Sequence, residues 1–352
     1  MKRQLAISIL LLHLVNVGTA QEKPALPYAD RVRLAEALRL NSFVSDRVWK
    51  GWSKIPFAVL LITQDYEFLI RHPQPSSDFS LIGYDPLLKS KVYFRKRIFS
   101  KRLQATFPAI QPSPISTIVI GEAESTESGT STPWVITLMH EHFHQLQTSQ
   151  ATYYVSVNAL NLSRGDKTGM WMLNYAFPYD QKEVQDQFLS LSKLLVNVVN
   201  TETGLDRGTQ LTEYLRARSE FERALKPDDY KYFSFQLWQE GIAHYTEYRV
   251  AKLAAAKYHP GKQFRALKDF TSFADAFREI RDTIINQLST QRLGEKKREV
   301  VYPFGAAEAL LLDEVNPSWQ SRYFVDRFDL RKYFDTSAST RREEPVHRSH
   351  RR

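Results

Sequence analysis

The sequence predicts an α+β fold, in which a small and mostly antiparallel sheet is followed by a helical subdomain. Up to residue 131 the apolar residues gather in short runs of strand length, whereas from residue 132 onward they recur at helical spacing. Hydrophobic residues make up 43% of the 352 residues, which is enough material for one large domain or two closely joined subdomains.

The first 20 residues have the pattern of a signal peptide for export. Lys2 and Arg3 precede an apolar run over residues 5–17, and small residues at 18–20 offer a cleavage site before Gln21. The run is shorter than a comfortable membrane span, so we expect a secreted or periplasmic protein with no stable membrane insertion after signal removal. An uncleaved membrane anchor is the alternative.

Residues 21–131 form the expected β-rich subdomain. It opens with a helical pattern over residues 30–43. Strand-like runs follow at 57–63, 66–71, 92–98, 103–107 and 116–120, the first two forming a hairpin. Small polar residues then fill 121–131, which predicts a mobile surface loop. Such a loop is either a plain connector or close to the rim of a cleft.

Residues 132–336 form the expected helical subdomain. Helical apolar spacing occurs at 132–150, 184–199, 209–225, 231–257, 264–288 and 305–314. The tail over residues 337–352 is rich in Ser, Arg and His, and we expect it to be disordered and basic.

Charge and cysteine content narrow the classes of function. The net charge is +9, but two of these charges fall in the signal segment and three in the tail, which leaves a modest excess elsewhere. We therefore expect no nucleic-acid partner. The chain has no cysteine, so any metal must be held by histidines and carboxylates.

The most informative motif is His140-Glu141-His142-Phe143-His144, which fits the pattern H-E-x-x-H. Thr132 is a favourable N-cap for the helix that carries it, and Pro133 suits the first helical position. His140 and His144 project from one face of that helix and can share a zinc ion, with Glu141 as general base to a metal-bound water. His142 points elsewhere and is expected to pack.

Two histidines leave a zinc site incomplete, so the chain must supply a third ligand. The best candidates lie in the segment 237–248, where Glu240, His244 and Glu247 share one helix face. Gly241 is costly inside a helix, and its place there predicts that another helix approaches closely. An ordinary amphipathic helix with a solvated acidic face is the alternative.

Together the two segments resemble the gluzincin metallopeptidases. The run Trp238-x-Glu240-Gly241-x-Ala243-x-Tyr245-x-Glu247 is similar to the second ligand helix of the aminopeptidase N group. This resemblance implies a zincin-like fold, Zn²⁺ as cofactor and Glu240 as the third ligand. It covers only two short helices. The ligand segments are 95 residues apart here instead of roughly twenty, and the G-x-M-E-N exopeptidase signature is missing, so aminopeptidase specificity is not carried over.

The resemblance also implies a donor for the oxyanion, because gluzincins often use a tyrosine downstream of the third ligand. Tyr302, which opens a late helix, is our choice, and His244 is the competitor because it shares the Glu240 face. Glu247 is expected to orient a ligand imidazole. Tyr245 projects away from Glu240 and is expected to pack.

The sequence as a whole predicts an exported zinc metallopeptidase that hydrolyses peptide or protein substrates, with Glu141 and Tyr302 as catalytic residues. One alternative is a non-catalytic zinc-binding envelope protein, and the presence of a base at Glu141 argues against it. A second alternative is a zinc hydrolase that acts on a non-peptide amide.

Overall fold

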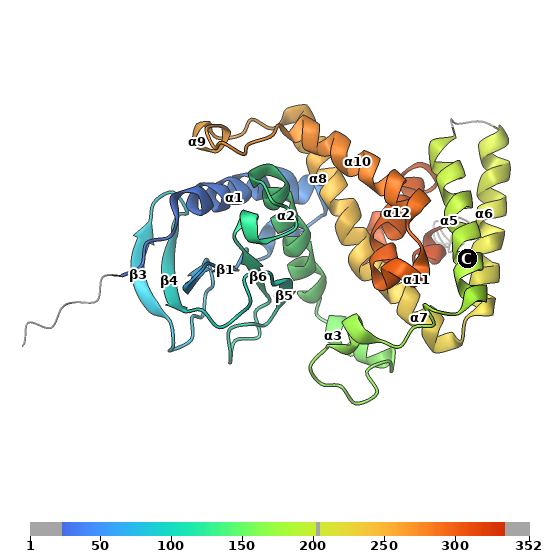
Figure 1. Cartoon of the computed structure of the whole chain (residues 1–352), viewed down its shortest axis with the longest axis horizontal. Coiled ribbons are helices and arrows are strands. Elements are labelled where there is room, and N and C mark those ends of the chain that lie inside the picture. The colour runs from blue at the N-terminus through green and yellow to red at the C-terminus, as the bar shows by residue number, and fades with distance from the viewer. Residues whose placement is uncertain (1–22, 202–204, 335–352) are drawn as a thin grey trace, which may run out of the picture.

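A six-stranded sheet forms one end of the molecule and a group of helices forms the other (Figure 1). The computed structural model describes residues 23–201 and 205–334. The expected signal peptide over residues 1–20 and the expected disordered tail over 337–352 lie outside the described residues. The α+β fold class predicted from the sequence is confirmed. Within the described ranges, no helix has the length and apolar character that crossing a membrane requires.

The sheet is mostly antiparallel, as predicted, with the strand order β3-β4-β2-β1-β6-β5. Its one parallel pair in the described chain is β1 with β6, and β5 lies at one edge beside β6. The strands are β1 (Val59–Ile62), β2 (Tyr66–Ile70), β3 (Ser80–Asp85), β4 (Ser90–Lys96), β5 (Gln104–Phe107) and β6 (Thr117–Gly121).

Both faces of the central strands are buried. Successive side chains of a strand point to opposite faces, and accordingly Val59 and Leu61 join the main core while Leu60 and Ile62 join a smaller second core. Helices cover the first face, and Phe79 and Ile110 from loops close the second. The sheet therefore gives helix α2 (Ser131–Thr148), which contacts β5 and β6, a well-packed support.

The sequence did not predict strand β3. Its residues are largely exposed, and Gly83 interrupts their pattern, so they carry no apolar alternation of their own. They adopt a strand because β4 offers a partner with which to pair. All five strands that the sequence predicted are present, each within a few residues of its expected bounds.

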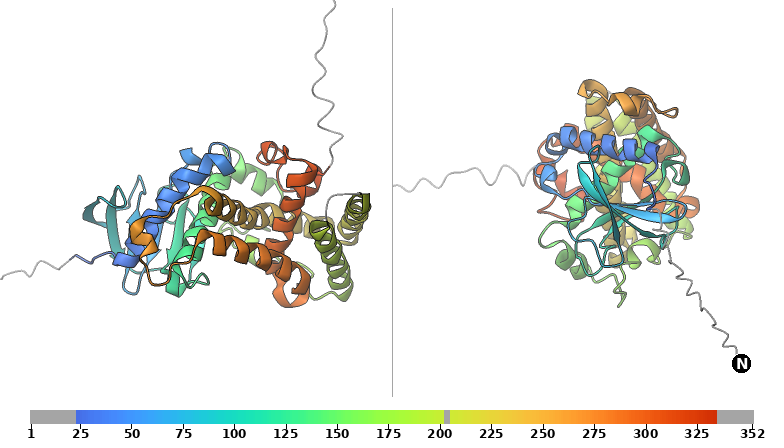
Figure 2. Two further views of the ribbon diagram at one scale, coloured as in Figure 1. Left: turned by 90° about the horizontal axis from the view of Figure 1, so that it is seen from above. Right: turned by 90° about the vertical axis from the view of Figure 1, so that its left-hand side faces the viewer.

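The helices α1 and α2 lie next to the sheet, and the remaining longer helices follow beyond them (Figures 1 and 2). The helices are α1 (Tyr28–Val48), α2 (Ser131–Thr148), α3 (Tyr153–Ala159), α4 (Trp171–Asn174), α5 (Lys182–Asn200), α6 (Leu205–Ala224), α7 (Pro227–Gln236), α8 (Ile242–Lys257), α9 (Lys262–Arg265), α10 (Phe273–Thr290), α11 (Leu293–Lys296) and α12 (Val301–Val315). Short helical turns include η2 (Ala123–Ser125) and η4 (Lys297–Val300).

One predicted helix is locally irregular and another is interrupted. The segment 231–257 is helical throughout, as predicted, but contains a π-helical turn η3 (Leu237–Gly241) between α7 and α8. The segment 264–288 is broken by a loop between α9 and α10. Apolar spacing continues through both the π-turn and the loop, which is why periodicity alone did not reveal them.

The start of α2 differs from the prediction. The helix begins at Ser131 with Thr130 as N-cap, and the hydroxyl of Thr132 donates to the backbone oxygen of Thr271 instead of capping. The loop before it was expected to be mobile, but Glu124 accepts two hydrogen bonds from the buried Arg33 of α1. Tertiary contacts thus hold both the loop and the first turn of α2.

Candidate metal centre

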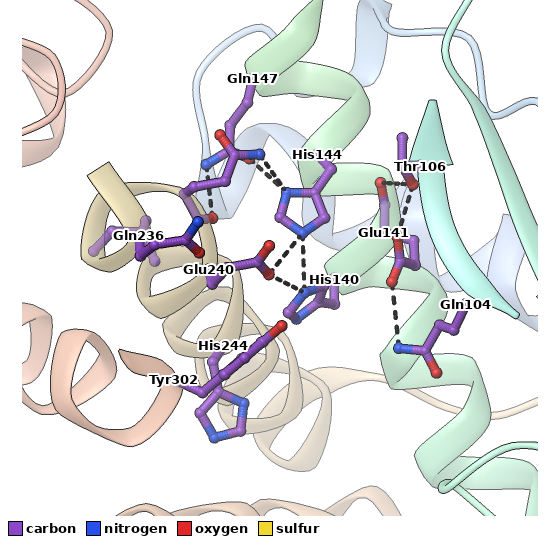
Figure 3. A network of polar contacts seen from close by, with 12 residues as sticks. Gln104, Thr106, His140, Glu141, His144, Gln147, Gln236, Glu240, His244 and Tyr302 are labelled. Atoms are coloured by element: carbon purple, nitrogen blue, oxygen red, sulfur yellow. Dashed lines mark hydrogen bonds and ion pairs between the residues drawn. The ribbon is translucent and has the colours of Figure 1, made fainter. Parts of the chain in front are cut away.

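Three ligand-type atoms from two elements converge on one point beside α2 (Figure 3). The Nε2 atoms of His140 and His144 are 3.1 Å apart, and Oε2 of Glu240 in η3 lies 3.7 Å and 3.4 Å from them. Two ligands of one tetrahedral zinc ion at about 2.0–2.1 Å lie about 3.3 Å from each other. The spacing of the three atoms therefore fits a common metal ion.

Neighbouring groups orient the two imidazoles. Nδ1 of His140 lies 2.6 Å from Oε1 of Glu247, which can only accept, so this nitrogen carries an N–H. In the neutral form this leaves Nε2 of His140 with a lone pair directed at the common point. Nδ1 of His144 lies 2.6 Å from Oε1 of Gln147 and 3.1 Å from Nε2 of Gln239, and these two amides fix the orientation of its ring. Glu247 contacts the ring of His140, as its expected role requires.

The centre has an excess of electron-pair donors that favours a bound cation. Burial opposes charge on His140, but the carboxylates of Glu240 and Glu247 outweigh it and raise its pKa well above the usual value. Burial likewise opposes charge on Glu240, yet the neighbouring imidazoles and Arg298 hold its pKa well below the usual range. The pKa of Glu247 falls to about 2. The carboxylates thus favour a positive charge at His140, and a metal ion that replaced its proton would meet two imidazole nitrogens and a carboxylate oxygen at one point.

A close helix crossing places Glu240. A Cβ atom added to Gly241 would lie 2.6 Å from the Cα atom of Gly305 in α12, which is closer than real contacts allow. The close approach predicted from Gly241 is therefore confirmed. The crossing coincides with the π-helical turn η3, and single π-turns are frequent at functional sites.

The carboxylate of Glu141 is held by the edge strand β5. Its Oε2 accepts a hydrogen bond from Oγ1 of Thr106 at 2.8 Å, and its Oε1 accepts one from Nε2 of Gln104 at 3.3 Å (Figure 3). Glu141 is 4% exposed, and its neighbours His140 and His144 are 5% and 7% exposed. The sheet thus holds the carboxylate that the motif places beside the metal ligands.

Tyr302 lies at the centre, as expected, and its hydroxyl is bound by Arg298. Its ring stacks on that of His140 with centroids 6.2 Å apart, and its hydroxyl accepts a hydrogen bond from Nη1 of Arg298 at 3.1 Å. Burial and the nearby carboxylate of Glu240 raise the pKa of Tyr302 well above its usual value. The phenol therefore stays protonated and can donate a hydrogen bond.

His244 lies beside the centre but not in it. Its Nδ1 faces Oε2 of Glu247 at 3.0 Å, so Glu247 connects it with His140, and its ring meets the edge of Tyr302. His142 packs between Trp52 and Phe57, which confirms the expectation that it packs.

Tyr245 is buried, and its hydroxyl donates to Asp313 in α12, so it packs as expected. Two surface hollows of about 530 Å³ each are lined by residues outside the metal centre.

Sequence reasoning missed several residues that hold the centre. Gln147 supports His144 and also donates to the backbone oxygens of Trp238 and Gln239, which ties α2 to η3. Its spacing of three from His144 was a signal for this role. Arg298 stands four residues before Tyr302, which was a similar signal.

The chain was also compared with other proteins. No family model, curated protein or solved structure matches it.

Proposed function

We propose that this chain is a zinc-dependent hydrolase of peptide bonds with a zincin-like arrangement of the gluzincin type. The observation that supports it is the convergence of His140, His144 and Glu240 on one point, although 95 residues separate the second from the third. A second support is Glu141, held beside them by β5. Two histidines can lie close together on a helix by chance, but chance would not explain why the carboxylate of Glu240 from a distant segment lies beside both of them.

The donor set favours zinc at a catalytic site. Two imidazole nitrogens and one carboxylate oxygen are a common catalytic set for zinc, which then keeps one position open for water or substrate. Structural zinc sites are typically closed by four protein ligands, mostly cysteines, and this chain has no cysteine. The non-catalytic zinc-binding alternative is therefore the weaker of the two.

In this proposal each residue has one task. Zn²⁺ would supply a Lewis acid that polarises the scissile carbonyl and acidifies water. Glu141 takes the proton of the attacking water and passes it to the leaving nitrogen. The hydroxyl of Tyr302 donates a hydrogen bond to the oxygen on which negative charge develops. Gln104 and Thr106 hold Glu141 in position for its part.

The edge strand β5 supports a peptide as the substrate. In the described sheet β5 pairs on one side only, with β6, and it is the strand that holds Glu141. An extended peptide can add to such an edge through backbone hydrogen bonds. A small non-peptide amide would make no use of this edge.

The test combines metal content with turnover. The purified protein is assayed for zinc and incubated with a mixed peptide library, with chelator, without it, and after zinc is returned. We expect one zinc per chain and cleavage that disappears with chelator and returns with zinc. Stoichiometric zinc without any cleavage would favour the non-catalytic zinc-binding protein. If the protein cleaved non-peptide amides but no peptide, the result would favour a zinc hydrolase of non-peptide amides.

A further inference from the structure

Arg298 stands at the metal centre with most of its donors unused. It belongs to the helical turn η4, and its Nη1 donates to the hydroxyl of Tyr302 at 3.1 Å. The same atom lies 3.6 Å from Oε1 of Glu240, which is beyond hydrogen-bond distance. Among the described residues it forms no further hydrogen bond or ion pair, although a guanidinium has five N–H donors.

The position of Arg298 in the centre is unusual for a residue that only supports the fold. Its side chain is 23% exposed, whereas the ligand histidines and Glu141 are nearly buried. It therefore lies where the centre meets solvent. A purely structural arginine beside a buried carboxylate would be expected to bind it with two parallel hydrogen bonds, and Arg298 forms none with Glu240.

The backbone just before Arg298 is strained. Lys297 has φ 50° and ψ −122°, a conformation that residues other than glycine rarely adopt. Such strain costs about 1–3 kcal/mol and persists where the surroundings enforce it, often at binding sites. Here it directs the chain from α11 into η4, and so fixes the place of Arg298.

The charge of the centre permits an anionic ligand at this place. When His140 is neutral, as a metal ligand must be, the carboxylates of Glu141, Glu240 and Glu247 are opposed among the described residues of the centre by Arg298, which leaves two negative charges. A divalent metal would neutralise them. A carboxylate that approached Arg298 would then meet a guanidinium with free donors and no net repulsion.

We propose that Arg298 binds the free carboxylate at the C-terminal end of the substrate, so that the substrates are peptides with an unblocked carboxyl end. This inference rests on the proposed hydrolysis at the same centre. One extended residue spans about 3.3–3.6 Å. A carboxylate on Arg298 therefore places one of the last peptide bonds at the ligand atoms, and the preceding residues can extend toward β5.

The reaction is a balanced hydrolysis that needs no further reagent. The oxygen of water bonds to the carbonyl carbon of a peptide bond near the C-terminus, and the C–N bond breaks. The leaving nitrogen takes up a proton. The products are a shortened peptide with a new carboxylate and a short C-terminal fragment with a new amine. Only the fragment carries the carboxylate that Arg298 held.

The first test measures binding without turnover. Zinc-loaded Glu141→Gln protein is mixed with N-acetyl dipeptides that end in a free carboxylate, or with the same dipeptides as C-terminal amides, and bound peptide is quantified by equilibrium dialysis. We expect the acids to bind roughly 10-fold to 100-fold more tightly, because a hydrogen-bonded charge pair is lost in the amides. Equal binding of acids and amides would refute the inference.

Variants assign the difference to Arg298. Arg298→Ala in the same background should abolish the preference for acids, and Arg298→Lys should keep part of it, because an ammonium cannot bind a carboxylate in a bidentate way. Lys296→Ala is the matched control, since Lys296 is a cation of the same segment that pairs with Glu299 at the surface, and it should change nothing. Zinc content is measured for every variant. A preference that survives in zinc-loaded Arg298→Ala would instead assign Arg298 to supporting Glu240.

The second test separates this inference from the proposed function. Wild-type protein is given the acid and the amide peptides and the rates of cleavage are compared. Equal cleavage of both would refute the role of Arg298 while the hydrolase proposal stands. Selective binding of acids without cleavage of any peptide would refute the hydrolase proposal while the carboxylate site stands.

Discussion

Glu141 differs from its neighbours on α2 because β5 holds both its carboxylate oxygens. We predict that Glu141→Gln keeps the fold and the metal, since glutamine preserves the shape and can still bond to Thr106. Hydrolysis should fall by about two to four orders of magnitude, because glutamine cannot accept the proton of water. Steady-state kinetics beside a zinc assay measure this. Near-normal turnover would exclude Glu141 as the base.

Glu240 and Glu247 both contact His140, but only Glu240 points to the common centre. We predict that Glu240→Ala is largely free of zinc, whereas Glu247→Ala binds about 10-fold to 100-fold more weakly than wild type. His244→Ala should lose less, because His244 contacts the centre only through Glu247. Titration of zinc against a competing chelator ranks the three. If Glu240→Ala binds zinc like wild type, the third ligand is another residue.

At the scale of residues, sequence spacing predicted which candidate site residues share one face of a helix. His140 and His144 are one turn apart, and Glu240 and Glu247 share a face, so local geometry sufficed for these candidates. The contact of Arg298 with Glu240 and the pairing of Gln147 with η3 were not predictable, because both depend on which distant segments pack together. No local pattern records that choice.

The crossing of η3 with α12 depends on two glycines that face each other. A Cβ added to Gly305 would lie 2.7 Å from Cα of Gly241 and 2.9 Å from the backbone oxygen of Leu237. We predict that Gly305→Ala destabilises the fold by about 1–3 kcal/mol, because the helices must move apart. It should also weaken zinc binding, because Glu240 moves with η3.

The matched control for this crossing is Gly208→Ala in α6. An added Cβ there meets nothing within 4 Å, so the variant should gain about 0.5–1 kcal/mol from helix propensity. Thermal unfolding and zinc titration measure both variants. If Gly305→Ala matches wild type in both measurements, the crossing does not position the ligand.

At the scale of elements, the prediction succeeded where the apolar pattern decides the structure. The buried strands β1 and β6 and the amphipathic helices α5 and α10 each carry their own signal. Strand β3 and the turn η3 do not, because pairing with β4 decides the first and packing against α12 decides the second. Tertiary context determined these two elements.

At the scale of the whole molecule, α2 is the element shared by the sheet and the helices. It packs on β5 and β6 on one side and on α8 on the other. The proposed base is held from the sheet side through Thr106, and the carboxylate ligand comes from the helical side at Glu240. A metal at the centre would therefore connect α2 with the helical part of the molecule.

This arrangement predicts that zinc stabilises the whole fold. At a free zinc concentration 100 times the Kd, binding adds about 2.7 kcal/mol to the free energy of unfolding. For a domain of about 300 residues this corresponds to a rise in Tm of roughly 4 °C. Differential scanning calorimetry with zinc and with chelator measures the rise, and Glu240→Ala should show little of it.

The location of the effect is the sharper part of this prediction. Without metal, the imidazoles of His140 and His144 face the carboxylate of Glu240 directly, and a proton on His140 takes the place of the metal charge. The contact between α2 and η3 then rests on Gln147 and its neighbours. Chelation should therefore speed amide hydrogen exchange in η3 and the first turns of α8 and α12, while β1 keeps its protection. Faster exchange spread evenly over both the sheet and the helices would contradict a metal that connects α2 with η3.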